Sequence, residues 1–198
     1  MKKVHLFVFP GFADWEPAHA IAELRRNGNY DVEVVGISVE PVVSMGGMTV
    51  QPTRDLSHVH TDDVAVFILP GGDSWEHEPV NAELTTLLRK LDEAGVPIAA
   101  ICGATIGIAR IDLLHGRRHT SNGLTYMREQ VPGYSENANY VDAPAVRDRG
   151  LITASGLADV EFAAEIMTEL EVLSAADRAL WTDMFRSGRI PDGTPSNA

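Results

Sequence analysis

The sequence predicts an α/β domain whose mostly parallel sheet is covered by helices on both faces. Apolar runs that suit buried strands alternate along the chain with segments of helical periodicity, and this alternation is typical of parallel sheets. The chain of 198 residues, of which 44% are hydrophobic, is also long enough to bury one sizeable core. We therefore expect a single domain over residues 1–187 and a flexible tail over 188–198, where proline, glycine and serine recur.

The first half of the chain predicts a regular succession of strands and helices. Apolar runs, most of them closed by proline or glycine, indicate strands at 4–9, 31–37, 64–69 and 98–101. Apolar residues at helical spacing indicate helices at 18–24 and 82–94. The adjacent glycines Gly46 and Gly47 favour a hairpin over residues 42–50. These elements follow one another as β-loop-α units with a hairpin at the side of the sheet.

The second half of the chain is less regular. Residues 117–139 are polar and predict an irregular segment. A turn at Asp148-Arg149-Gly150 is expected to join two strands that pair with each other. The elements expected here are a short helix at 124–129, strands at 140–146 and 151–154, and a helix at 158–170.

The last predicted helix begins at Ser174, a residue type that favours the N-cap position. Its apolar stripe includes Trp181 and Phe185, and it is large for the surface of a monomer. We expect this stripe either to cover the sheet or to bury against a second chain.

Cys102 is the only cysteine, and it lies where a strand is expected to turn directly into a helix. The residues that follow it, Gly103 and Ala104, are small, as a strained strand-turn-helix elbow requires around its nucleophile. Because the N-terminus of a helix favours negative charge, we expect the thiol to ionise more readily than a free cysteine. The alternative is that Cys102 is a small buried core residue without chemistry.

Two other loops follow predicted strands and are expected at the same edge of the sheet, where parallel α/β folds bind their ligands. The loop after residues 4–9 carries Glu16, which can serve the thiol as a proton carrier if burial raises its pKa. The alternative is an acidic residue that complements the helix dipole. Gly71 and Gly72 can bring backbone N–H groups close to an oxyanion, although Pro-Gly-Gly is also an ordinary turn.

Composition indicates which binding partners and which cellular compartment to expect. The chain has 28 acidic and 16 basic residues, so its net charge of -12 disfavours nucleic acids and anionic membranes. A single cysteine excludes an intramolecular disulfide, and with no leader segment or long apolar stretch we expect the cytoplasm. The histidines are scattered without ligand spacing, so neither a metal nor another cofactor is expected.

Several motifs together carry a resemblance to a known family over nearly the whole chain. They are Phe9-Pro10-Gly11 leading to Glu16, Ile68-Leu69-Pro70-Gly71-Gly72, Ala100-Ile101-Cys102-Gly103, Tyr134-Ser135-Glu136, the stretch 150–155 and Glu161-Phe162-Ala163. In these the chain resembles the ThiJ/PfpI superfamily, a class I glutamine-amidotransferase-like group that includes the Parkinsonism-associated deglycase, bacterial stress proteases and isocyanide hydratases. The last three motifs are similar to the deglycase branch.

The resemblance implies a flavodoxin-like three-layer sandwich that is usually a homodimer. It also implies that Cys102 is the nucleophile, that Glu16 is its acidic partner, and that amides near Gly72 and Gly103 form the oxyanion site. These roles are expectations that the structure must test.

The chain departs from the family at the histidine. One branch has histidine directly after the cysteine, where this chain has Gly103. Other branches have histidine after paired threonines, and the stretch His119-Thr120-Ser121-Asn122 places Asn122 there. His119 reaches the site only if the register shifts. His77, after the Gly71-Gly72 loop, is a further candidate, and the alternative for both is an ordinary surface histidine.

The leading hypothesis is an enzyme in which Cys102 adds to a small electrophile, as in glyoxalases, deglycases or amidohydrolases, while Glu16 moves the proton. The alternative is an oxidative-stress sensor in which Cys102 is oxidised and held by Glu16 without turnover. A peptidase or an isocyanide hydratase is less favoured, because the histidine is missing. Regulation of transcription is disfavoured by the acidic charge and by the single helix after the domain.

Overall fold

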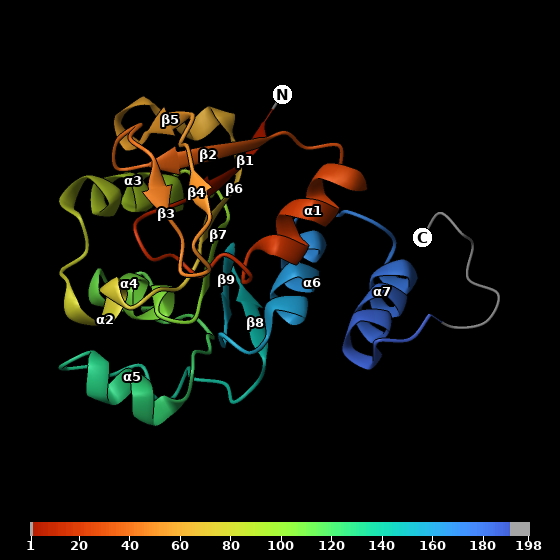
Figure 1. The fold of residues 1–198 in the computed structure, drawn as a ribbon. Helices are drawn as coiled ribbons and strands as arrows, with labels where there is room; N and C mark the ends of the chain where they lie inside the picture. The colour runs from red at the N-terminus through yellow and green to blue at the C-terminus, as the bar shows by residue number, and fades with distance from the viewer. Residues whose placement is uncertain (1, 191–198) are drawn as a thin grey trace.

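The computed structural model describes residues 2–190, which form a sheet with helices on both sides (Figure 1). Its strands are β1 (Lys3–Phe7), β2 (Val32–Gly36), β3 (Val42–Val43), β4 (Thr49–Val50), β5 (Arg54–Asp55), β6 (Val64–Leu69), β7 (Ile98–Ile101), β8 (Ala145–Asp148) and β9 (Leu151–Ala154). Its α-helices are α1 (Ala18–Arg26), α2 (Ser74–His77), α3 (Ala82–Glu93), α4 (Ala104–Arg110), α5 (Leu124–Gln130), α6 (Asp159–Glu169) and α7 (Ala175–Ser187). Short 3-10 helices span Leu56–His58 and Thr61–Asp63.

The main sheet has the strand order β5-β2-β1-β6-β7-β9-β8. All neighbouring strands are parallel except β8 and β9, which are antiparallel. Every residue of β6 and of β7 is buried, as expected for strands covered on both faces. The prediction of a mostly parallel α/β sandwich of flavodoxin-like arrangement is confirmed.

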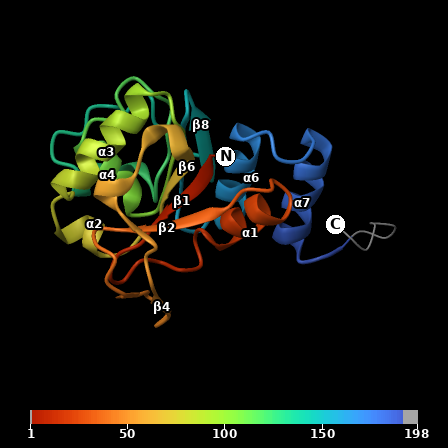
Figure 2. The ribbon, with the colours of Figure 1, turned by 90° about the horizontal axis from the view of Figure 1, so that it is seen from above.

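Helices form two layers around this sheet. Seen from above, α3 and α4 cover one face, while α1 and α6 cover the other and α7 packs outside them (Figure 2). Helix α5 lies at the lower edge of the molecule in Figure 1, near the ends of α2 and α4. The core between the layers includes the fully buried Phe67, Ile98 and Phe162.

The chain passes from β1 to β2 on one side of the sheet and then returns to β6 on the other side of β1. The strand order therefore reverses between β1 and β6, which is where open α/β sheets form their binding crevice. The loops after β1, β6 and β7 lie at this edge and carry Glu16, Gly71 and Cys102.

The strand expected at 140–146 is wrong in its position, because the observed strand β8 covers Ala145–Asp148. Pro144 has no N–H to donate to a ladder, so regular pairing begins after it. Tyr140 and Val141 instead pair with His119, whose carbonyl accepts from the Val141 N–H at 2.8 Å. The predicted turn is confirmed: Arg149 and Gly150 have φ values of 49° and 76°, as a tight hairpin requires.

The two 3-10 helices, strand β5 and helix α2 were not predicted from the sequence. Strand β5 has only two residues and pairs with the edge of β2. Helix α2 has four residues and follows the Gly71-Gly72 turn directly. All of them are shorter than the windows in which periodicity becomes visible. The tail predicted over 188–198 lies largely outside the described residues, which end at Ile190.

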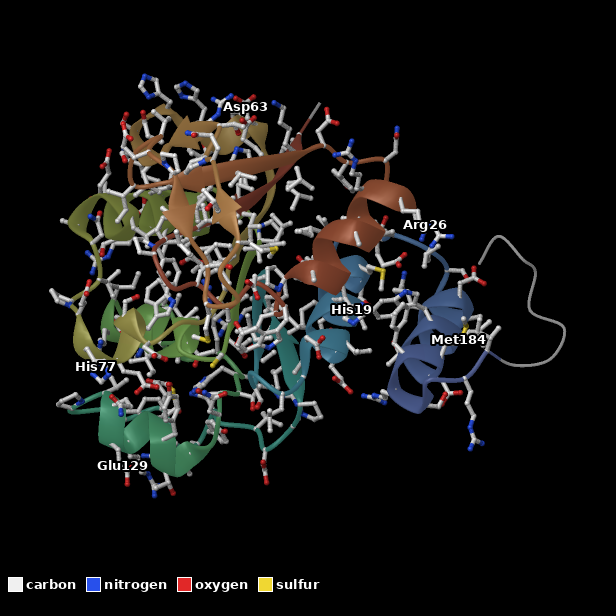
Figure 3. All side chains as sticks on the ribbon, in the orientation of Figure 1. His19, Arg26, Asp63, His77, Glu129 and Met184 are labelled. Atoms are coloured by element: carbon white, nitrogen blue, oxygen red, sulfur yellow. The ribbon has the colours of Figure 1, made fainter. Side chains whose placement is uncertain are left out.

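The apolar stripe of α7 does not cover the sheet. Trp181 is only 8% exposed, because it packs against His19 of α1 at a ring distance of 5.7 Å, while Phe185 is 44% exposed. Figure 3 labels His19 on α1 and Met184 on α7, the two helices that this contact joins. The helix is thus attached to the domain by Trp181, by the contact of Phe185 with His19 and by a hydrogen bond from Arg186 to Glu161, and part of its apolar face stays exposed.

Candidate active site

The backbone at Cys102 has the strained geometry of a nucleophile elbow. Strand β7 ends at Ile101 and α4 begins at Ala104, so two residues make the turn. Cys102 has φ of 57°, a left-handed conformation that costs a non-glycine residue on the order of 1–3 kcal/mol. Its N–H donates to the Ala154 carbonyl at 3.0 Å, and its carbonyl accepts from the Thr105 hydroxyl at 2.6 Å. These bonds hold the strained residue and fix the direction of its side chain.

Two glycines make room for the thiol and the carboxyl group. A Cβ atom at Gly71 would lie 2.7 Å from the Cys102 Cβ and 2.8 Å from Glu16 Oε2. A Cβ atom at Gly156 would lie 2.8 Å from the Cys102 Sγ and 3.2 Å from Glu16 Oε1. At each glycine the contact with Cys102 is below 3.0 Å, which real Cβ atoms essentially never show, so glycine at both positions lets the sulfur and the carboxylate lie side by side.

Glu16 is buried beside the sulfur, with 1% of its surface exposed. The Gly71 N–H donates to its Oε2 at 2.5 Å. Burial disfavours the charged carboxylate and raises the pKa of Glu16 to about 7, although the Gly71 hydrogen bond acts the other way. A carboxyl group with this pKa exchanges its proton near neutral pH. The alternative of an exposed acid at a helix N-terminus does not fit, because Glu16 lies before α1 and points inward.

The expectation of an acidic thiol is wrong. Burial raises the pKa of Cys102 to about 11, and the negative charge of Glu16 acts in the same direction. Hydrogen bonds from Asn122 and from the Gly103 amide favour the thiolate but are the smaller effects. The helix that begins beside the half-buried sulfur has seven residues, and desolvation of the thiol outweighs the helix dipole. The thiol therefore needs a base, and Glu16 is the adjacent one.

Asn122 lies at the sulfur, in the position expected from the sequence. Its Nδ2 donates to the Cys102 Sγ at 3.3 Å, and its Oδ1 accepts from the Gly156 N–H at 2.9 Å. The bond to the backbone N–H fixes which end of the amide is oxygen, so the NH₂ group must face the sulfur. An amide at this position stabilises a thiolate but does not carry a proton.

Neither histidine proposed for the site contacts Cys102. His119 is fully buried, with Nδ1 at 2.7 Å from the Arg117 carbonyl and Nε2 at 2.5 Å from the Tyr134 hydroxyl. Both ring nitrogens are thus engaged away from the sulfur, and the register shift that would bring His119 to the site is absent. His77 is exposed at the end of α2, as Figure 3 shows.

The three glycines expected at the oxyanion site differ in their availability. The Gly71 amide is occupied by Glu16, so it cannot also serve an oxyanion. Among residues 2–190 the Gly72 amide donates to no protein oxygen. The Gly103 amide interacts with the sulfur itself. This leaves the Gly72 amide as the expected donor to a substrate oxygen.

Several residues around the sulfur were missed by the sequence reasoning. The Tyr126 hydroxyl donates to Glu76 Oε1 at 2.7 Å, and Tyr126 also interacts with Asn122 and Cys102. Behind the elbow, the hydroxyls of Thr105 and Ser121 lie 2.6 Å apart. Glu76 lies on the unpredicted α2, and Tyr126 lies on α5. No motif marked these positions, because each reaches the site only through the packing of α2 against α4 and α5.

The described part of the chain offers no other obvious chemistry at this edge. Within residues 2–190 no group of three or more His, Cys, Asp or Glu side chains is placed to hold a metal ion. No helix in that range is both long and apolar enough to cross a membrane.

The chain is similar to several known proteins. Residues 2–169 match the DJ-1/PfpI family. The chain is 38% identical to a Bacillus subtilis protein named as an uncharacterized protease, YoaZ, with 91% of this chain and 89% of that protein covered. It is 26% identical to a deglycase of Thermococcus kodakarensis, over 77% of this chain and 89% of that one.

A solved structure shows the same fold. The crystal structure of a thiJ/pfpI family protein from Bacillus anthracis superimposes with a TM-score of 0.87 and 32% sequence identity. The match covers 95% of this chain and 92% of that one. The fold and the family match are therefore consistent with each other.

Proposed function

The chain belongs to the DJ-1/PfpI family, and we propose that it is an enzyme in which Cys102 attacks a small electrophilic carbon while Glu16 carries the proton. The observation that supports this most directly is the buried carboxyl group of Glu16. It lies beside the sulfur of a strained cysteine and has a pKa of about 7. A general base is most effective when its pKa is near the working pH. Relatives named as a protease and as deglycases support enzymatic activity in the family.

The first chemical step follows from the two pKa values. The thiol, with a pKa of about 11, is protonated near neutral pH, while Glu16, with a pKa of about 7, is partly ionised. As sulfur forms its bond to a carbonyl carbon, the S–H proton moves to the Glu16 carboxylate and the carbonyl electrons move to oxygen. The Gly72 amide is the donor available to that oxygen. Protonated Glu16 then returns its proton to the product or to the leaving group.

The substrate class that we favour is a small reactive carbonyl compound, as in glyoxalases and deglycases, with an amide or a nitrile-like carbon as the next candidate. A peptidase is less favoured, because a peptide nitrogen needs a proton donor as it leaves. No histidine lies at the sulfur in the described chain. Glu16 alone must then serve every proton transfer.

The test is consumption of a panel of electrophiles, including methylglyoxal, a simple amide and a nitrile, by the wild-type protein and by Cys102→Ala. We expect the wild type to consume at least one of these compounds and Cys102→Ala to consume none above the buffer rate. Cys102→Ser is a matched control, since it keeps the side-chain size and loses most of the nucleophilicity. Equal consumption by wild type and Cys102→Ala would remove Cys102 from the reaction.

A sensor that is oxidised at Cys102 is the second candidate. The missing histidine favours it, because oxidation needs no general base. The raised pKa of Cys102 opposes it, since peroxide reacts with the thiolate. Oxidation to a sulfinic acid consumes two peroxide molecules and adds two oxygen atoms, which intact-protein mass spectrometry detects. Stoichiometric oxidation at micromolar peroxide without turnover of any electrophile would favour the sensor.

We also propose a homodimer that works in the cytoplasm, as the family resemblance and the composition suggest. Light scattering checks the first part: a mass near the 21.5 kDa of one chain at micromolar concentration would contradict a stable dimer. Phe185→Glu tests α7 separately, because Phe185 is exposed while Trp181 already packs within the chain. Cell fractionation checks the compartment.

A further inference from the structure

Two polar side chains near the site, Tyr126 and Glu76, take no part in the mechanism described above. They come from α5 and α2, two elements that border the open side of Cys102. The Tyr126 hydroxyl donates its proton to Glu76 Oε1 at 2.7 Å, so a lone pair of the phenol oxygen is left to accept. Asn122 interacts with this same hydroxyl. Since the amide NH₂ group has two hydrogens, it can bond the sulfur and the phenol oxygen at once.

The donors and acceptors of these hydrogen bonds fit together without conflict. The Gly156 N–H donates to Asn122 Oδ1 at 2.9 Å, and Asn122 Nδ2 donates to the Cys102 Sγ at 3.3 Å. Asn122 also lies close enough to Tyr126 to lower the pKa of its hydroxyl, and the hydrogen of that hydroxyl is taken by Glu76. Asn122 is otherwise an exposed side chain on a loop, so without this pair it is held by the Gly156 bond alone.

Arg110 fixes the two helices that carry the pair. Its guanidinium group donates to the carbonyls of Trp75 at 2.6 Å and Glu76 at 3.2 Å on α2, and to Gln130 at 3.0 Å at the end of α5. One side chain of α4 thus sets the distance between the backbones that position Tyr126 and Glu76. An arrangement held in this way is more than a chance surface contact.

We propose that Tyr126 and Glu76 are positioning residues that hold the Asn122 amide as a hydrogen-bond donor to the Cys102 sulfur, and that they thereby favour the thiolate. The pair acts through orientation, because Asn122 does not pass a proton. The ionisable groups that face this sulfur are Glu16 from the loop before α1 and Tyr126 from α5. Asp159 of α6 acts on Glu16, and Glu76 of α2 acts through Tyr126.

The inference concerns the site on which the proposed function rests, but it is tested without any substrate. Because Cys102 is the only cysteine, the rate of alkylation by iodoacetamide at about pH 8 reports the thiolate at this one position. Tyr126→Phe removes the hydroxyl and should slow alkylation about tenfold, as loss of one hydrogen bond to a charged group implies. Tyr134→Phe is the matched control. It removes a hydroxyl that bonds His119, and it should react at the wild-type rate.

Two substitutions at Glu76 show whether this residue acts by positioning Tyr126 or by its negative charge. Glu76→Gln keeps an oxygen that accepts from Tyr126 and should stay within about twofold of the wild-type rate. Glu76→Ala leaves the Tyr126 hydroxyl without its acceptor and should react as slowly as Tyr126→Phe. If charge were the cause, both substitutions would remove a negative group and both would speed alkylation.

The double variant Tyr126→Phe/Asn122→Ala tests whether Tyr126 acts on the sulfur through Asn122. It should be no slower than Asn122→Ala alone, because Tyr126 acts only through Asn122. Alkylation in urea, where all variants must react equally, excludes trivial differences in the reagent or the protein concentration. Wild-type reactivity of Tyr126→Phe, or a further slowing in the double variant, would overturn the proposal. If no electrophile is ever turned over, these rates still decide it.

Discussion

The two sides of the Cys102 sulfur are built in different ways. On one side Glu16 is 1% exposed, lies in the loop after β1, and is bonded to the Gly71 amide in the loop after β6. On the other side Asn122 is exposed and reaches the sulfur from a loop held by side chains of short helices. The proton carrier therefore lies in the buried part of the site, and the hydrogen-bond donor to the thiolate lies in the exposed part.

This difference shows that a proton carrier and a hydrogen-bond donor need different surroundings. Burial is what raises the pKa of Glu16, so a proton carrier of this type needs the sheet around it. A hydrogen-bond donor needs only orientation, which short helices and one arginine can supply. The buried side should accordingly tolerate substitution least.

The largest effect is expected for Glu16→Gln. This change keeps the shape of the side chain and its bond to the Gly71 amide, but it removes the proton carrier, so turnover of a responsive electrophile should fall roughly 10²–10⁴-fold. Asn122→Ala, which removes only a hydrogen bond, should cost about tenfold. The measurement is kcat/KM for both variants on the same substrate. Equal losses would mean that the two sides do not differ in role.

The next largest loss of turnover is expected at Gly156, which lies close to Glu16 on one side of the sulfur and bonds Asn122 on the other. Gly156→Ala would place a Cβ atom 2.8 Å from the Cys102 Sγ and 3.2 Å from Glu16 Oε1, so it must push sulfur and carboxylate apart. A displacement on the order of 1 Å can cost about a hundredfold in rate, and we expect a loss of that size. The neighbouring Leu157 is 96% exposed, and Leu157→Ala is the matched control that should behave as wild type. An active Gly156→Ala variant would show that the contact is not required.

The buried side could be predicted from the sequence and the open side could not. Strands such as β6 and β7 are continuous apolar runs, and the loops that follow them in a parallel sheet must meet at one edge, which brings Glu16, Gly71 and Cys102 together. Tyr126 and Glu76 meet through α2, a helix of four residues that has no periodic signal. Asn122 was placed at the sulfur only by family resemblance.

The acidity of the thiol was predicted with the wrong sign for a related reason. A helix N-terminus is visible in the sequence, whereas the burial of sulfur beside a carboxyl group is a property of the packed structure. Here burial outweighs the dipole, and the pKa rises to about 11. His119 is a similar case, because its two buried bonds depend on the approach of Tyr134 and of the Arg117 carbonyl.

Stability should depend on pH through Glu16. The pKa of this carboxyl group is 4.5 in the unfolded chain, its ordinary value, and about 7 in the folded chain. Below about pH 4.5 the group is protonated in both states, whereas between 4.5 and 7 only the unfolded chain ionises, so rising pH favours unfolding. The difference corresponds to about 3 kcal/mol of lost stability above pH 7.

Urea unfolding of wild type and Glu16→Gln at several pH values measures this loss. Glu16→Gln has no group to ionise here, so its stability relative to wild type should rise by about 2–3 kcal/mol between pH 4.5 and pH 7.5. The difference between the two proteins is needed, because other groups act in the opposite direction. Glu33, whose bond with Lys3 lowers its pKa to about 2, is one of them. A difference that stays constant with pH would show that Glu16 is not buried as described.

The smallest effect is expected for Asn122→His, which changes the open side alone. Asn122 Nδ2 lies 3.3 Å from the Cys102 Sγ, so an imidazole at this position can reach the sulfur and supply a second proton carrier. Because Glu16 already carries the proton, we expect only about a tenfold rise in dicarbonyl turnover, less than the roughly 10²–10⁴-fold that a sole general base contributes. His119→Ala should leave turnover unchanged, since His119 bonds Tyr134 and the Arg117 carbonyl instead. A rise in the Asn122→His variant that disappears with Glu16→Gln would show that both sides must act together. A fall below the wild type would mean that the amide at 122 contributes more as a thiolate donor than a base contributes in its place.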